Sequence, residues 1–125
     1  MNFEDKINEL KIKLPKAADP VGSYVAAKIS NKMLFISGQI SINEKGELIK
    51  GKPGKDLDTE AGYNAAKRCA LSIIAQVKKA CNDDLSKVKS CIKPPYCGTR
   101  PNLNFVKRSL IGSFVDFVPS INISP

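Results

Sequence analysis

Apolar residues along the chain are grouped into short runs that alternate with polar, glycine-containing segments, and their spacing predicts strands and one long helix. Tyr24–Ile29 and Lys32–Ile40 have the composition of strands and meet at Ser30-Asn31, which predicts a hairpin. Val88–Lys93 predicts the opening of a third strand. Residues 43–54 are charged and glycine-bearing, so we expect an exposed loop there.

From Asp58 onward the apolar residues recur at the spacing of a helix, which predicts a helix over about 58–81. Asp58 or Thr59 can cap its start, and Lys78 and Lys79 suit its C-terminal end. The apolar stripe of this helix comprises Ala66, Cys69, Ala70, Ile73, Ile74, Val77, Ala80 and Cys81.

Both ends of the chain carry weaker patterns. Residues 3–13 place Phe3, Ile7 and Leu10 on one helical face, which fits a short amphipathic helix, a strand or a loose arm. Residues 103–117 place five apolar residues on one face and predict a second helix. The segment between this helix and Lys93 is rich in proline and has neither strand nor helix character.

Composition restricts the chemistry that we expect. No apolar run approaches the ~20 residues of a membrane span, and the N-terminus does not look like a secretory signal, so we expect a cytoplasmic protein. Histidine is absent, which excludes Ser-His and Cys-His nucleophile pairs. The four cysteines form no CxxC pair, so we expect buried thiols and no metal site.

The formal net charge of +8 raises the question of nucleic-acid binding. All basic residues except Arg68, Arg100 and Arg108 are lysines, and they are scattered along the whole chain. Aromatic residues are few and are not interleaved with arginine. The pattern therefore favours a solvated lysine surface over a nucleic-acid footprint.

Four stretches carry a specific set of motifs: "PVGSYVAA", "LFISGQIS", "TEAGYNAAKRCALSIIAQVKKA" and "DLSKVKSCIK". In this order they resemble the RidA (YjgF) family over residues 14–93, and most closely its endoribonuclease L-PSP-like, or translation-inhibitor-like, subgroup. The resemblance implies a single RidA-like domain over 1–125, in which 94–125 is divergent. It also implies an α+β, chorismate-mutase-like sheet covered by one long helix and a second helix.

The family further implies a homotrimer with sites in the clefts between subunits, and no cofactor. Its best understood members hydrolyse reactive enamines and imines, such as 2-aminoacrylate, to 2-keto acids and ammonia. Gly38 has no Cβ, so a small carboxylate or imine can approach the backbone there, on the side opposite Ser37 and Gln39. Tyr24 would supply a hydroxyl or an apolar wall. Tyr24, Ser37 and Gly38 are therefore the candidate substrate-binding residues.

The end of the chain departs from the family. Where the family has Pro-x-Arg, with an arginine that grips the substrate carboxylate, this chain has Pro119-Ser120-Ile121. Arg108 and Arg100 are the two candidate substitutes, and Arg108 is the one that we include among the substrate-binding residues. The chain stops as the last strand begins, so this strand is expected to be truncated, and no glutamate follows Glu60. The catalytic residues are therefore unknown.

Three functions remain open at this point. The first is an enamine/imine deaminase. The second is a non-catalytic member of the same fold that binds a small ligand or acts through subunit contacts, which the missing arginine and glutamate favour. The third, an RNA-binding or ribonuclease-like role, is suggested by the subgroup and the charge but lacks a catalytic constellation.

Overall fold

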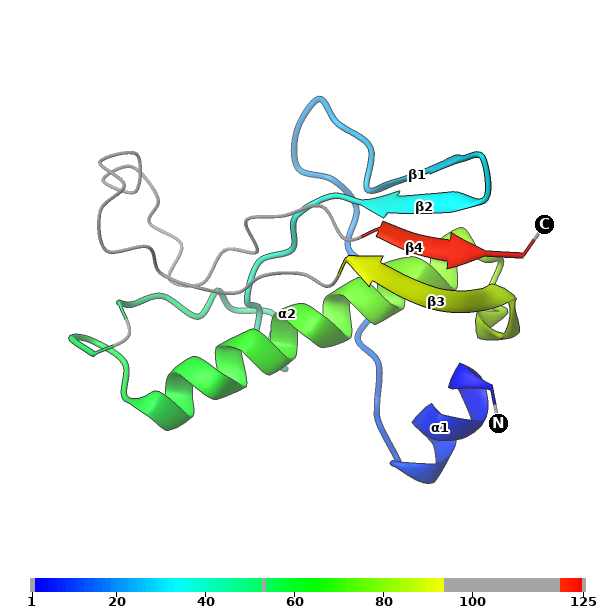
Figure 1. The fold of residues 1–125 in the computed structure, drawn as a ribbon. Helices are drawn as coiled ribbons and strands as arrows, with labels where there is room; N and C mark the ends of the chain where they lie inside the picture. Colours follow the sequence, from blue (N-terminus) through cyan, green and yellow to red (C-terminus); the bar gives the residue numbers. More distant parts are fainter. Residues whose placement is uncertain (1, 53, 94–119, 125) are drawn as a thin grey trace. The chain divides into compact units, whose positions relative to one another are not determined.

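A short helix, a hairpin, a long helix and two further strands follow one another in the computed structural model (Figure 1). The structure describes residues 2–52, 54–93 and 120–124. The elements are α1 (Phe3–Glu9), β1 (Ala27–Ser30), β2 (Met33–Ile36), α2 (Thr59–Ala80), the 3-10 helix η1 (Leu85–Lys87), β3 (Val88–Lys93) and β4 (Ser120–Ile123). The helix predicted over 103–117 lies outside the described residues.

The chain divides into two compact units, which are taken separately below. The first comprises residues 1–37, 71–94 and 118–125, and the second comprises residues 38–70 and 95–117. Within the described residues, no helix is both long and apolar enough to cross a membrane.

An antiparallel four-stranded sheet with the order β1-β2-β4-β3 forms the first unit. The last strand, which we expected to be truncated, is present with four residues and lies between β2 and β3. Its Ile121 is paired with Leu34 of β2 on one side and with Cys91 of β3 on the other. The sheet confirms the α+β, chorismate-mutase-like fold that the motifs predict.

One face of the sheet packs against the later part of α2 (Figure 1). Alternate residues of β2 and β4 are buried on this face, as period-two side-chain alternation requires. The helix contributes buried residues at its own spacing, so both elements share one core. The buried apolar residues of this unit include Leu34, Ile36, Ile73, Ala75, Val77, Cys81, Leu85, Ile121 and Ile123.

The predicted long helix is confirmed over Thr59–Ala80. Of the two candidate caps, Asp58 is used, because its Oδ1 accepts a hydrogen bond of 2.7 Å from the Ala61 amide. The helix ends where Asn82 and Asp83 adopt positive φ angles of 57° and 61°.

The N-terminal segment begins with α1, which decides among the three alternatives for residues 3–13. Asn2 and Asp5 form a reciprocal capping box at its start. At its end, Lys11 has φ 51° and the Ile12 amide bonds back to the Ile7 carbonyl, which is a Schellman-type termination. Glu4 of α1 accepts a 2.7 Å hydrogen bond from Lys78 of α2.

The predicted hairpin is confirmed, with strands shorter than expected. The turn lies one residue later than the predicted Ser30-Asn31: its residues are Asn31 and Lys32, with φ 46° and 63°, and Ser30 is paired with Met33. Two successive positive φ angles define a type I′ turn, whose hand matches the twist of the strands. Lys32 therefore holds a position that glycine would occupy with less strain.

We expect Lys32→Gly to raise the free energy of unfolding by about 0.5–1 kcal/mol, because glycine relieves the left-handed backbone. The substitution keeps the Lys32 carbonyl, which accepts a 2.9 Å bond from Ile123. Urea unfolding followed by circular dichroism measures the change. Lys28→Gly, inside β1, is the matched control and should lower stability; a loss of stability in Lys32→Gly as well would contradict the turn assignment.

Candidate functional site

The sequence predicts Tyr24 at the start of a strand, but the structure places it in a bend before β1. Its amide donates to the Gly22 carbonyl at 2.8 Å, which folds the chain back over two residues. A Cβ at position 22 would lie 3.2 Å from the ring of Tyr24, so glycine lets the ring fold against the backbone. The ring is 49% exposed and therefore accessible to a ligand.

Ser37 directly follows β2, which ends at Ile36 and not at Ile40 as predicted. Its amide donates to the Ala26 carbonyl at 2.9 Å, and its hydroxyl donates to the Val25 carbonyl. Both acceptors belong to the segment between Tyr24 and β1. Because the hydroxyl bonds to the backbone of this segment, Ser37 links the end of β2 to the Tyr24 segment.

Gly38, the next residue, is half-buried and belongs to the second compact unit. Arg108 and Arg100, the candidate carboxylate clamps, lie outside the described residues. Of the predicted site residues, the structure thus brings together Ser37 and the segment that carries Tyr24. Among the described residues, no group of three or more Cys, Asp or Glu side chains is placed to hold a metal ion.

Ile121 is the residue that the resemblance placed at the position of the family's arginine. Its side chain is buried in the core of the sheet, opposite Leu34. An arginine here would place a charge among apolar side chains without a partner, at a cost of several kcal/mol. In this chain the position serves the core.

The segment leading to Tyr24 is bound to α2 through contacts that we did not predict from the sequence. Gln76 Nε2 donates to the Ala18 carbonyl at 2.6 Å, and Lys79 Nζ donates to Asp19 Oδ1 at 3.0 Å. The hydrogen bond and charge of Lys79 lower the pKa of Asp19. The sequence could have indicated this contact, because Gln76 is a polar residue on the apolar stripe of the helix. It lies three residues after Ile73 and four before Ala80.

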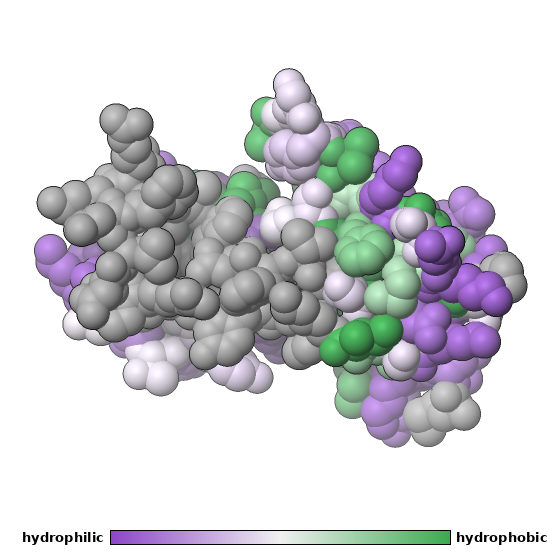
Figure 2. Space-filling model, turned by 45° about the horizontal axis from the view of Figure 1, so that its top comes forward, coloured by the Kyte–Doolittle hydropathy of each residue, from purple (hydrophilic) through white to green (hydrophobic). Residues whose placement is uncertain are grey.

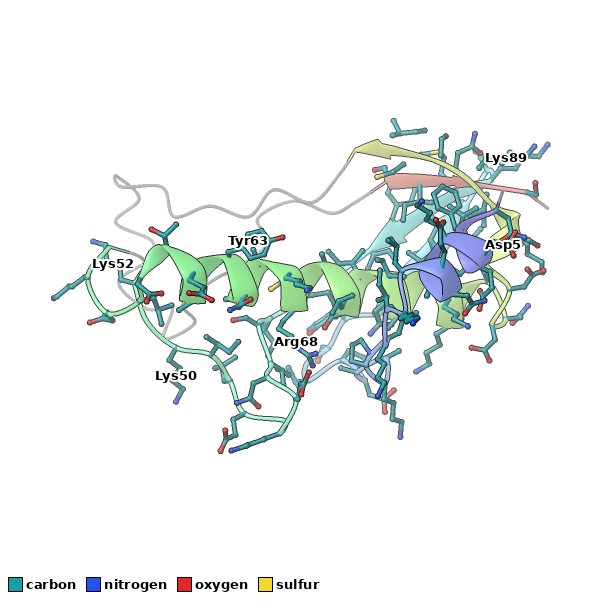
Figure 3. The ribbon with its side chains drawn as sticks, turned by 90° about the horizontal axis from the view of Figure 1, so that it is seen from below. Asp5, Lys50, Lys52, Tyr63, Arg68 and Lys89 are labelled. Carbon is teal, nitrogen blue, oxygen red and sulfur yellow. The ribbon has the colours of Figure 1, made fainter. Side chains whose placement is uncertain are left out.

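In the second unit, residues 41–49 form a narrow loop closed by pairing of Ile42 with Leu48. The Asn43 side chain accepts from the amides of Lys45 and Glu47, each at 2.9 Å, and shapes its tip. Figure 3 shows Arg68 reaching from α2 toward this loop, where its Nε donates to the Ile42 carbonyl at 2.7 Å. Arg68 thus attaches Ile42, the residue directly before the predicted 43–54 loop, to α2.

Comparison with known proteins adds the following. The family model described as YjgF/chorismate mutase-like, putative endoribonuclease, matches residues 4–96. Protein TCP17 of Trypanosoma cruzi is 38% identical over 87 residues, which cover 70% of this chain and 54% of that protein. A RutC family protein of Aquifex aeolicus (strain VF5) is 57% identical over 42 residues, covering 33% of this chain and 34% of that protein. The chain thus spans about half or less of the length of these relatives.

Two solved structures share the fold. The protein Atu1372 from Agrobacterium tumefaciens, of unknown function, has a TM-score of 0.73 and 25% identity, over 97% of this chain and 92% of that one. A putative endoribonuclease from Shewanella oneidensis MR-1 has a TM-score of 0.64 and 32% identity, over 70% of this chain and 58% of that one. The motifs, the sheet and these matches agree, and the chain belongs to the YjgF/chorismate mutase-like family, which includes the RidA-type proteins.

Proposed function

We propose that this protein is an enamine/imine deaminase that acts on small carboxylates such as 2-aminoacrylate in the cytoplasm. The observation that carries the proposal is the Ser37-Gly38 step at the end of β2, where the exposed Tyr24 ring lies on a segment bonded to Ser37. Family membership supports the reaction class. The Ser37 hydroxyl already bonds to a carbonyl, so its role in the proposal is to shape the site and not to attack the substrate.

The proposed reaction needs three things from the protein. The substrate carboxylate has to be held, the enamine has to become its imine by gaining a proton on carbon and losing one from nitrogen, and water has to add to the imine carbon. Breaking the C–N bond of the resulting adduct then releases ammonia and leaves the 2-keto acid. Arg108 is our proposed carboxylate clamp, because a planar guanidinium binds a carboxylate through two parallel hydrogen bonds.

Tyr24 and Gly38 have complementary tasks in this proposal. The half-exposed Tyr24 ring provides an apolar wall beside the planar substrate and a hydroxyl that can donate a hydrogen bond. Gly38 keeps the main chain free of a side chain, so that backbone groups can orient the substrate.

The test is to follow ammonia and keto-acid release from 2-aminoacrylate generated in situ. We expect the wild type to accelerate the release. Arg108→Ala should lower kcat/KM by about 10- to 100-fold, the loss expected for one charge-assisted contact. Arg100→Ala tests the other candidate clamp: a loss of this size in Arg100→Ala and not in Arg108→Ala would contradict the assignment of the clamp to Arg108. If the wild type gives no acceleration over the blank, the deaminase proposal is wrong and the non-catalytic alternative takes its place.

We further propose that the active form is a homotrimer, with the sites between subunits. The face of the sheet opposite α2 supports this proposal, because Phe35 is 39% exposed there and is paired with Lys28 and Ser120. Figure 2 shows hydrophobic surface exposed among strongly hydrophilic side chains. A second copy covering this face would remove an aromatic side chain from water.

Light scattering coupled to size exclusion measures the assembly directly. We expect the wild type to elute with three times the chain mass of 13.6 kDa, and Phe35→Lys to shift toward one chain mass. Tyr63→Lys, which alters another exposed aromatic residue on α2 (Figure 3), should leave the mass unchanged. A wild type that elutes as a monomer, or a Phe35→Lys variant that remains trimeric, would contradict the proposed interface.

A further inference from the structure

The segment Ala18–Val25, here called the Tyr24 loop, is solvent-exposed at every residue. Val21 is 90% exposed and Tyr24 is 49% exposed, so apolar packing contributes little to the position of the loop. A loop without buried side chains is expected to open at a lower free energy than the sheet beside it. Contacts at its two ends must therefore set the position of the Tyr24 ring.

The C-terminal end of the loop is bound to β2. The Ser37 hydroxyl bonds to the Val25 carbonyl, and the Ser37 amide bonds to the Ala26 carbonyl. Because Ser37 directly follows a strand whose Leu34 and Ile36 are fully buried, this end is attached to the core.

The N-terminal end is bound to α2, and here one contact should dominate. Gln76 is only 2% exposed, and its Nε2 donates to the Ala18 carbonyl at 2.6 Å. The neighbouring Lys79–Asp19 pair is 57% and 84% exposed, and exposed ion pairs contribute little because water screens them. A buried amide has few alternative partners and a fixed position in the helix, so it restrains the loop more strongly.

We propose that Gln76 is a positioning residue that holds the Tyr24 loop in place from within the buried face of α2. This inference rests on the proposed function only in giving Tyr24 a role in substrate binding. Gln76 is not a catalytic residue, since it acts through the backbone of Ala18. Its loss should raise KM more than it lowers kcat, because the wall of the site is displaced while the reacting groups remain.

The experiment compares three variants by amide hydrogen exchange and by deaminase kinetics. Gln76→Met keeps the length and apolar contacts of the side chain and removes the donor. Lys79→Met removes only the exposed ion pair. Ile73→Val removes one buried methyl group from the same face of α2 and leaves the Gln76–Ala18 hydrogen bond in place, and so controls for a general loss of stability.

We expect the Tyr24 amide, which bonds to Gly22 within the loop, to exchange about tenfold faster in Gln76→Met while the Leu34 amide in β2 is unaffected. Lys79→Met should change the Tyr24 rate by less than about threefold. An unchanged Tyr24 rate in Gln76→Met would overturn the proposal, as would equal acceleration at Tyr24 and Leu34. If the loop loosens selectively but the wild type shows no deaminase activity, the positioning role holds and the proposed function fails.

Discussion

The pairing of β4 between β2 and β3 is the constraint on which the first unit depends. The four residues of β4 form backbone hydrogen bonds with the strands on both sides. Ile121 and Ile123 complete the apolar face that α2 covers. Without β4, the β1–β2 hairpin and β3 would have no backbone connection within the sheet. Hairpins of two strands are marginal on their own, so this short strand has a large effect.

The proposed site depends on the same pairing through β2. A strand held on both sides and buried at Leu34 and Ile36 presents Ser37 at a fixed position. Ser37 then binds the Val25 and Ala26 carbonyls, while α2 binds Ala18 and Asp19 at the other end of the same loop. The position of the exposed Tyr24 ring therefore depends on hydrogen bonds at both ends of its loop, and these bonds come from residues that the core holds in place.

Hydrophobic periodicity was sufficient to predict the elements whose own side chains form the core. The long helix, β3 and the hairpin were all predicted from spacing, and the family motifs predicted the sheet that they build. Strand ends were less predictable, because the exposure of Tyr24 and the side-chain bond of Ser37 depend on contacts between segments distant in sequence. Ser120–Ile123 alternates polar and apolar residues, as a half-buried strand does, but it has only four residues. Its sequence alone therefore did not predict its central place in the sheet.

The residues of the proposed site could be suggested from the sequence only where a motif indicated them. Ser37 and Gly38 follow from the strand motif, whereas the role of Gln76 requires knowing that the Ala18 carbonyl lies opposite it across 58 residues of chain. Ile121 shows the reverse case. Alignment with the family suggested a lost functional residue, and the structure shows a core residue whose burial explains why an apolar side chain is favoured there.

The most direct test of this account is to compare the stability of two neighbouring substitutions in β4. Ile121 is buried and is paired with Leu34 and Cys91, whereas Asn122 is half-buried on the opposite face. Cys91 itself is exposed, so the expectation of a buried thiol is wrong at this position. By urea unfolding, Ile121→Asp should lower the free energy of unfolding by about 3–5 kcal/mol, and Asn122→Asp by less than about 1 kcal/mol. Equal, small losses in both variants would show that β4 is not the central strand of a packed sheet.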